Sequence, residues 1–374
     1  MIFTVSSGKL QKKLISVSGA LGSNGTLPIL ESFLFVVEDG ELTISATDLE
    51  TFKTNKLDVM SDSDGAIVIP AKILIDVLKA LPEQPLSFHI DMDTSVISIM
   101  SQTGKYKLIG EPSGDFPDLP ELDEDAQIIT IPARVFQEAI SKCLLAVGND
   151  EFRPAMMGVY FKINNNTVTF VATDAHKLIK YTNKNIASNI SNDVILPKKV
   201  LSLLKSEIAN RDVELEISID ESNVFFKVLD VLMVGRLIDA KYPDYEAVIP
   251  DDNHISVCLN KQDFQSALKR LAIFSNQTTH QVNFHVRPHE MELNSKNLDF
   301  DNEATEKIDC ELIGDDSMEI AFNAKFLGLT LGAIDTEDVL LSLSEPNRAG
   351  LLKPATQDDN ADVTILLMPI MLGY

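Results

Sequence analysis

The chain has 374 residues, a formal net charge of −24 and 45% hydrophobic residues, which is enough apolar material for more than one core. No apolar run approaches the roughly 18 residues of a membrane span, and the first five residues predict a strand rather than a signal peptide. The three cysteines and six histidines are widely spaced, so we expect packed thiols, a cytoplasmic protein, and no metal or cofactor.

The first 110 residues predict two amphipathic helices among several strands. Leu10, Leu14 and Val17 form the apolar stripe of a helix over residues 7–20. Alternating segments at 33–37 and 42–45 predict strands, and a second helix follows over 71–80. Strands at 86–90, 96–100 and 106–109 complete this module. Each helix must cover one face of a sheet with its apolar stripe.

The same pattern returns at a spacing of about 126 residues, so we expect three similar modules. Ala46-Thr47-Asp48 returns as Ala172-Thr173-Asp174, and Phe116-Pro117-Asp118 returns as Tyr242-Pro243-Asp244. Further helices are predicted over 133–146, 198–208, 261–273 and 324–334. The two Thr-Asp pairs predict turns stabilised by the aspartate. Residues 164–166 predict a turn and residues 187–193 a polar loop.

Two acidic, proline-containing stretches, at 111–125 and 239–252, predict linkers between the modules. They divide the chain into an N-terminal domain over 1–122, a central domain over 123–251 and a C-terminal domain over 252–374.

The six predicted helices carry fourteen basic and four acidic residues, although the whole chain is strongly acidic. If all six face the same way, they form a positive track that binds a polyanion through its phosphates without reading bases. The alternative is that lysine and arginine, as good helix formers, simply solvate exposed faces.

In addition, the chain resembles the beta subunit of bacterial DNA polymerase III, the DNA sliding clamp, along its whole length. The resemblance is carried by Thr26-Leu27-Pro28-Ile29-Leu30, Ala46-Thr47-Asp48-Leu49-Glu50, Asp115-Phe116-Pro117, Val171-Ala172-Thr173-Asp174-Ala175-His176-Lys177-Leu178, Tyr242-Pro243-Asp244-Tyr245 and Met368-Pro369. It implies an α+β clamp fold of three modules, each with two helices packed on antiparallel sheets. It further implies a head-to-tail homodimeric ring whose helices line the bore and encircle double-stranded DNA.

The family function implied is that of a processivity factor without catalysis. The partners implied are the replicative polymerase subunit, the clamp loader and repair polymerases, which bind through short linear motifs, with no membrane partner. The positions that match the family's peptide groove are Met156, Thr173, Ala175, His176, Lys177, Leu178, Pro243, Val248, Leu367, Met368, Pro369, Ile370, Met371 and Leu372. A flexible, polarizable methionine suits a groove that takes several partners. The tail departs from the family pattern, because it continues to Gly373-Tyr374 and has Met371 where a basic residue is common.

The resemblance also implies positions for DNA contact and for the joint between the two subunits. The DNA-contact candidates are Asn24, Lys72, Arg153, Lys12, Lys198 and Lys199, with Asp150, Pro154 and Ala155 at further matching positions. Asn24 replaces a frequent arginine, and Pro154-Ala155 replaces an aromatic pair. At the joint, Tyr106 and Leu108 are expected to face Ile273 and Phe274, with Lys105 and Lys107 facing Glu303 and Glu306.

His176 beside Asp174 does not predict an acid–base pair, since no nucleophile or metal-binding motif accompanies it. A different class of function stays open at this point: a monomeric repeat scaffold that binds an acidic polymer or protein on one basic face. The two hypotheses differ in topology, because only the clamp requires a closed dimer.

Overall fold

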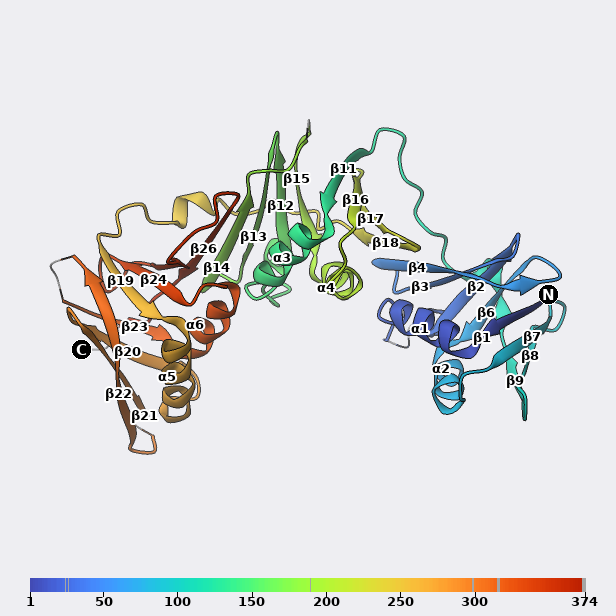
Figure 1. Cartoon of the computed structure of the whole chain (residues 1–374), viewed down its shortest axis with the longest axis horizontal. Helices are drawn as coiled ribbons and strands as arrows, with labels where there is room; N and C mark the ends of the chain where they lie inside the picture. The colour runs from blue at the N-terminus through green and yellow to red at the C-terminus, as the bar shows by residue number, and fades with distance from the viewer. Residues whose placement is uncertain (24, 26, 189, 298, 315–316, 372–374) are drawn as a thin grey trace. The chain divides into compact units, whose positions relative to one another are not determined.

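The computed structural model describes residues 1–23, 25, 27–188, 190–297, 299–314 and 317–371, so the candidates Asn24 and Leu372 lie outside the described residues. The chain forms two compact units (Figure 1). The first comprises residues 1–134 and 199–237, and the second comprises residues 135–198 and 238–374. Among the described residues no helix is both long and apolar enough to cross a membrane.

The first unit contains a five-stranded and a nine-stranded sheet, in the orders β5-β1-β7-β8-β9 and β10-β6-β2-β3-β4-β18-β17-β16-β11. Its strands are β1 (Ile2–Ser6), β2 (Ser32–Glu38), β3 (Glu41–Thr47), β4 (Thr51–Asp58), β5 (Met60–Ser61), β6 (Gly65–Pro70), β7 (Pro85–Asp91), β8 (Val96–Met100), β9 (Lys105–Ile109), β10 (Glu111–Pro112), β11 (Gln127–Pro132), β16 (Glu214–Ile219), β17 (Asn223–Val228) and β18 (Val231–Arg236). Its helices are α1 (Ser7–Ser18), α2 (Ala71–Ala80), α4 (Lys198–Glu207, whose first residue belongs to the second unit) and the 3₁₀ turns η1 (Pro28–Glu31) and η2 (Ser113–Asp115).

The largest core of the first unit lies where α1 and α2 cover its sheets. Leu10, Leu14 and Val17 of α1 are fully buried, as the stripe predicts. The rings of Phe3 and Phe88 stack with centroids 4.7 Å apart. Helix α1 begins because the Ser6 hydroxyl accepts a hydrogen bond from the backbone N–H of Lys9.

The second unit is built on one twelve-stranded sheet, in the order β15-β12-β13-β14-β26-β25-β24-β19-β22-β21-β20-β23. Its strands are β12 (Gly158–Asn164), β13 (Thr167–Thr173), β14 (Lys177–Asn183), β15 (Ser191–Pro197), β19 (Ile255–Asn260), β20 (Gln281–Val286), β21 (Glu290–Asn297), β22 (Asn302–Ile313), β23 (Met318–Asn323), β24 (Asp338–Leu343), β25 (Gly350–Pro354) and β26 (Ala361–Leu367). Its helices are α3 (Ala133–Cys143, whose first two residues belong to the first unit), α5 (Lys261–Phe274), α6 (Ala324–Thr330) and the 3₁₀ turns η3 (Pro154–Met157), η4 (Glu246–Val248) and η5 (Leu331–Ala333).

Successive modules are joined by antiparallel pairing of strand edges inside each unit. In the first unit β4 pairs with β18, with Lys53 opposite Met233. In the second unit β14 pairs with β26, with Ile179 opposite Ile365. Backbone hydrogen bonds therefore continue from one module into the next at both joints.

A buried lysine engaged in an ion pair accompanies each of these joints. In the first unit, Lys53 Nζ lies 3.0 Å from Glu207 Oε2, and their side chains are 3% and 9% exposed. Burial lowers the pKa of Lys53, although the Glu207 carboxylate opposes this shift. In the second unit, buried Lys142 of α3 pairs with Asp335 and donates to the Ala333 carbonyl at 2.9 Å. Removing Glu207 would leave Lys53 as an uncompensated buried charge, so the geometry of the first joint is strongly constrained. At the second joint Asp335 is 77% exposed, and Lys142 also lies 3.6 Å from Glu138.

The six predicted helices are confirmed in the described residues, and their ends differ by a few residues. The helix expected over 324–334 continues past Thr330 as 3₁₀ turn η5, which contains Gly332. Helix ends often tighten into a 3₁₀ turn, and at the end of α6 the Thr330 hydroxyl donates to the Leu327 carbonyl at 3.1 Å. The loop expected over 187–193 is wrong at its end, because Ser191–Asp193 already pair with β12. The domain boundaries at 122/123 and 251/252 stay predictions.

Candidate partner-binding groove and nucleic-acid interface

A tight turn between β13 and β14 positions the central residues of the candidate groove. The Asp174 carboxylate accepts hydrogen bonds from the backbone N–H groups of His176 and Lys177, both at 3.0 Å. Ala175 takes a left-handed conformation with φ of 73°. Burial raises the pKa of Asp174, but the hydrogen bonds and the charge of Lys177 outweigh this and hold the pKa below its ordinary value. Asp174 is thus engaged in the turn, as the sequence predicts, and holds Lys177.

The segment that follows β26 holds the second set of candidate groove residues. The backbone N–H of Met368 donates to the His176 carbonyl at 2.9 Å, and that of Ile370 donates to the Ala321 carbonyl at 2.7 Å. The side chain of Met368 is 44% exposed and that of Met371 is 70% exposed. The tail is therefore fixed to the sheet by its backbone and presents apolar side chains to solvent.

Helix α6 contributes an aromatic residue that the sequence interpretation missed. The Phe326 ring lies 5.8 Å from the His176 ring in a stacked arrangement, and Lys177 Nζ lies 4.6 Å from its centroid. No sequence motif connects Phe326 to His176, because they come from different modules.

Three tyrosines form an aromatic layer in the same unit. Tyr160 and Tyr242 stack with centroids 4.7 Å apart, and Tyr245 lies 5.8 Å from Tyr160. Burial raises the pKa of Tyr160 to about 12, and its hydroxyl donates to Asp193 at 3.0 Å. These phenols stay protonated at neutral pH and support the segment that carries Pro243.

The remaining groove candidates divide according to their exposure. Ala175, His176, Val248, Met368 and Met371 are exposed, whereas Met156, Pro243, Pro369 and Ile370 are half-buried. Thr173, Lys177, Leu178 and Leu367 are buried. The buried candidates therefore pack below the surface, and the exposed and half-buried ones are open to solvent.

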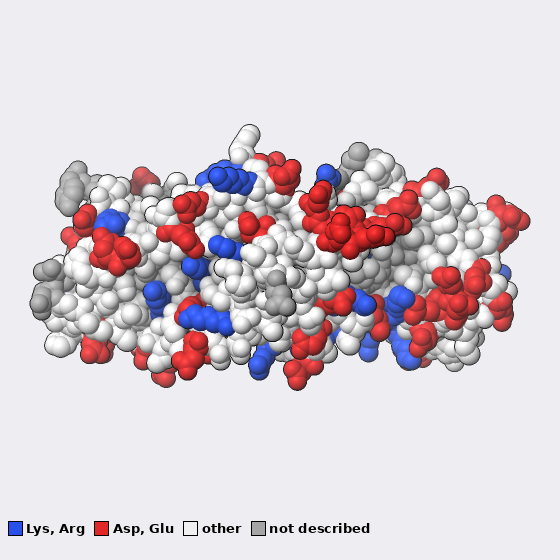
Figure 2. Space-filling model, turned by 90° about the horizontal axis from the view of Figure 1, so that it is seen from above, with Lys and Arg blue, Asp and Glu red and all other residues white. Residues whose placement is uncertain are grey.

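Some of the DNA-contact candidates are exposed cations, and others already bond to a neighbouring side chain. Lys12 and Lys72 are exposed on α1 and α2. Lys199 pairs with Asp48 at 2.6 Å, Arg153 pairs with Asp150 at 2.8 Å, and Lys198 donates to Asn149 at 2.8 Å. The acidic excess is plain on the face shown in Figure 2, where Asp and Glu side chains outnumber Lys and Arg.

Phe152 is a further candidate that the sequence interpretation missed. Its side chain is 96% exposed on the loop before Arg153, and its backbone N–H donates to Asp150 at 3.0 Å. The sequence signal is that Phe152 stands two positions before Pro154. The aromatic pair of the family is missing at Pro154-Ala155, but an exposed aromatic side chain lies close to it.

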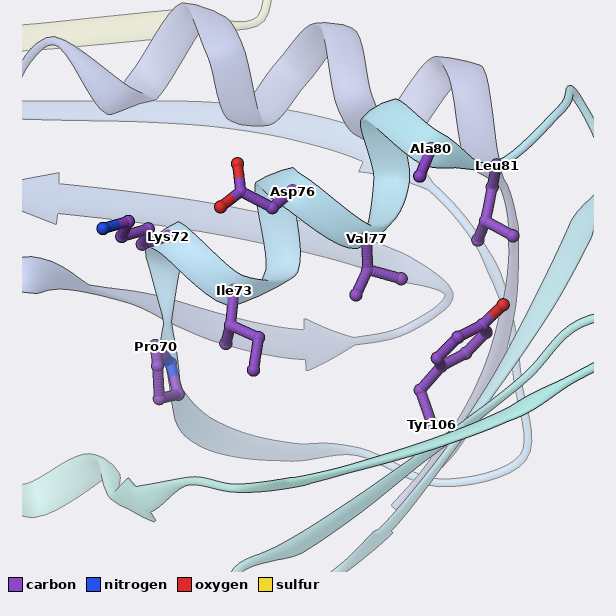
Figure 3. A pocket seen from close by; sticks show the side chains of 8 residues that line it. All are labelled: Pro70, Lys72, Ile73, Asp76, Val77, Ala80, Leu81 and Tyr106. Carbon is purple, nitrogen blue, oxygen red and sulfur yellow. The ribbon is translucent and has the colours of Figure 1, made fainter.

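Each unit also presents an unpaired strand edge. Among the described residues, β9 pairs with β8 alone, and the first part of β22 pairs with β21 alone. Beside β9 lies a pocket of about 570 Å³, which Ile73 helps to line and in which Val77 and Leu81 lie nearest to the Tyr106 ring (Figure 3). In the second unit, Ile273 is 71% exposed and Phe274 is 39% exposed at the end of α5. Leu108, in contrast, is buried in the core.

The two acids expected to face a partner's lysines, Glu303 and Glu306, already have basic neighbours in their own chain. Arg270 holds Glu306 through two hydrogen bonds, of 2.8 and 2.5 Å. Glu303 is more open, since its side chain is 54% exposed and lies 3.9 Å from Lys296. Glu303 is therefore the more accessible acid for a partner's lysine.

Comparison with known proteins accounts for all three modules. Sequence families described as the N-terminal, central and C-terminal domains of the DNA polymerase III beta subunit match residues 1–120, 130–244 and 246–371. The chain belongs to the DNA polymerase III beta subunit family. The curated Beta sliding clamps of Pseudomonas aeruginosa and Escherichia coli strain K12 are 29% and 28% identical to it, each with 100% of both chains covered.

The beta subunit fold extends over the entire chain. A crystal structure of the DNA polymerase sliding clamp from Pseudomonas aeruginosa with ligand superposes with a TM-score of 0.93 at 28% identity and covers 100% of both chains. The resemblance and the α+β clamp fold expected from the sequence are thereby confirmed.

Proposed function

We propose that this chain acts as a DNA sliding clamp: a binding ring, without catalysis, that encircles duplex DNA and tethers replication and repair proteins. The observation that carries the proposal is the clamp fold, found over the whole chain with an unpaired strand edge in its first and its last module. Two copies arranged head to tail would pair these two edges with each other at both joints. The setting is the cytoplasm, and no cofactor is required.

The joint between copies repeats the joints inside the chain. Lys53, Ile179 and Ala304 each lie opposite a buried small residue of the preceding strand. On the facing strands, Met233, Ile365 and Tyr106 each lie opposite a buried apolar residue of the strand before. Since Lys53 faces Met233 and Ile179 faces Ile365, we propose that Tyr106 faces the partner subunit's Ala304. This register sets Lys107 opposite the partner subunit's Glu303.

DNA binding in this proposal comes from helix charge and not from base contacts. Exposed Lys12 and Lys72 offer phosphate contacts, and Arg153, Lys198 and Lys199 provide further cations after exchange of their present partners. Phosphate contacts carry no sequence information, which allows movement along the duplex. The acidic remainder of the chain disfavours DNA elsewhere on the surface.

The groove around His176 and Met368 is the proposed site for partners' short linear motifs. Its support comes from the apolar, half-open side chains of Met156, Met368 and Phe326 beside a fixed backbone turn. A related sliding clamp from Pseudomonas aeruginosa, 28% identical with a TM-score of 0.93, has been solved bound to griselimycin. Griselimycin is accordingly a probe for the corresponding groove in this chain.

The topology of DNA binding tests the clamp against a monomeric scaffold. We expect a dimer near twice the chain mass of 41.2 kDa that, once loaded, stays on nicked circular DNA and slides off after linearisation. Sedimentation and gel filtration of the loaded complexes measure both properties. A monomer that binds short duplexes tightly at moderate salt would contradict the ring and favour the scaffold.

Reversal of paired charges tests the register of the joint. Lys107→Glu and Glu303→Lys should each weaken the dimer by about tenfold, because each sets like charges opposite one another. Combining both changes should restore the dimer. Sedimentation across a concentration series measures the dissociation constant. The register is wrong if the combined variant is no stronger than the single ones, or if Lys105→Glu with Glu303→Lys restores the dimer better.

A further inference from the structure

A second pocket, in the first unit, has no role in the function proposed above. Its volume is about 350 Å³. Its lining includes Leu21, Leu27, Leu30 and Leu49, together with Lys199. Leu27 and Leu49 are 47% and 46% exposed, so apolar surface remains open to solvent. Covering such surface is favourable at roughly 25 cal/mol per Å².

The backbone of this pocket repeats the backbone of the groove in the second unit. The N–H of Gly22 donates to the Leu30 carbonyl at 3.0 Å, as that of Gly148 donates to the Met156 carbonyl at 2.8 Å. A side chain on Gly22 would approach Leu30 to 2.8 Å, so this closure requires glycine. Leu30 therefore takes the place in this pocket that Met156 takes in the groove.

The turn beside the pocket is also repeated. The Asp48 carboxylate accepts from the backbone N–H groups of Glu50 and Thr51, and Leu49 is left-handed with φ of 80°. This arrangement corresponds to the turn at Asp174.

The turn accepts a backbone hydrogen bond at the same position in the pocket and in the groove. The N–H of Arg236 donates to the Glu50 carbonyl at 2.9 Å, and that of Met368 donates to the His176 carbonyl at 2.9 Å. The pocket and the groove thus share one loop closure, one turn and one strand-to-turn hydrogen bond.

The side chains at equivalent positions differ in charge. Glu50 stands where the groove has His176, and Glu31 adds a second exposed acid to the pocket lining. The charge of Lys199 is matched by Asp48 at 2.6 Å. Arg236 lies 3.7 Å from Glu50, but both side chains are about two-thirds exposed, at 66% and 65%. The pocket therefore offers an apolar floor and an acidic rim.

We propose that this pocket is a second peptide site, which takes an extended segment with a leucine-like side chain beside lysine or arginine. The apolar side chain enters between Leu30 and Leu49, and the basic side chain pairs with Glu31 or Glu50. The proposal rests on the proposed function in one respect, namely that the equivalent groove binds peptides. The two sites select different partners because their rims differ in charge.

Methyl spectroscopy of the full-length dimer separates the two sites, since leucine methyls report the pocket and methionine methyls report the groove. The probe is an acetylated hexapeptide with two central leucines flanked by lysines. We expect it to shift the methyl signals of Leu21, Leu30 and Leu49 in a saturable manner. The same peptide with glutamates in place of the lysines should not shift them.

Two leucine variants provide the control. Leu49→Asp should weaken binding of the lysine peptide by about tenfold, since it removes one wall of the pocket. Aspartate tolerates the left-handed backbone, so folding should be kept. Leu229→Asp is the matched control, because Leu229 is also left-handed, with φ of 50°, and is 62% exposed outside the pocket lining. It should bind like the unaltered chain.

The outcomes distinguish this proposal from the proposed function. Lysine-peptide shifts confined to Met156 and Met368, or equal affinity in Leu49→Asp and Leu229→Asp, would overturn the second site. Failure of griselimycin to shift Met156 and Met368 would instead count against the groove. Leucine shifts that persist in Met368→Lys would support a site independent of the groove.

Discussion

Ile273→Asp should convert the dimer into a monomer and abolish retention on circular DNA. Ile273 is 71% exposed at the end of α5, next to Phe274, and the proposed joint sets both against the partner's pocket of about 570 Å³ beside Tyr106. The change removes an apolar anchor and adds a charge that would be buried without a partner. Together these effects cost about 3 kcal/mol or more, which corresponds to a dissociation constant raised at least roughly hundredfold.

Sedimentation measures this effect, and Ile313→Asp is its matched control. Ile313 is 55% exposed in the same unit, but it lies at the end of β22 that is already paired with β19. The control should stay dimeric and remain on circular DNA. A dimer of undiminished strength in Ile273→Asp would show that α5 does not take part in the joint.

Met368→Lys should abolish binding of griselimycin and of polymerase-derived peptides while the dimer stays intact. The backbone of Met368 is held by its hydrogen bond to the His176 carbonyl, so the lysine side chain would start from the same place. It would bring a charge into an apolar site that already contains Lys177, whose Nζ lies 4.6 Å from the Phe326 centroid. Loss of apolar contact and charge repulsion should weaken binding by roughly a hundredfold.

Calorimetric titration measures this loss, with Met60→Lys as the control. Met60 is 75% exposed in the first unit and is not part of the groove. The control should bind both ligands with unchanged affinity. If Met368→Lys binds them as tightly as the control does, the assignment of the groove is wrong.

The elements of the fold were predictable because periodicity reports burial directly. The stripe of Leu10, Leu14 and Val17 is fully buried in α1, and the corresponding stripes predict the other helices. The ends were less predictable, because a helix can continue as a 3₁₀ turn, as α6 does in η5. Strand β15 begins at Ser191 in a polar stretch, because pairing with β12 and not hydrophobicity fixes its start.

Contacts between modules could not be predicted from the sequence, as the charged residues and the candidate groove illustrate. Lys142 was counted with a basic helical surface, but it is buried against Asp335, and no composition count reveals an ion pair across modules. The turn at Asp174 was predictable, since it depends on neighbouring residues alone. Phe326 was not, because its approach to His176 depends on the packing of α6.

The buried lysines at the two joints inside the chain bear on where a closed ring would open. Both joints inside the chain combine continuous backbone with a lysine shielded from solvent, at Lys53 and at Lys142. The proposed joint between copies has no covalent link, and its opposed charges, Lys107 and Glu303, lie in the exposed part of the surface. Mobile ions screen exposed charges far more than buried ones. In the proposed ring we therefore expect DNA to enter through the intermolecular joint, and we expect higher ionic strength to loosen that joint while the other two stay closed.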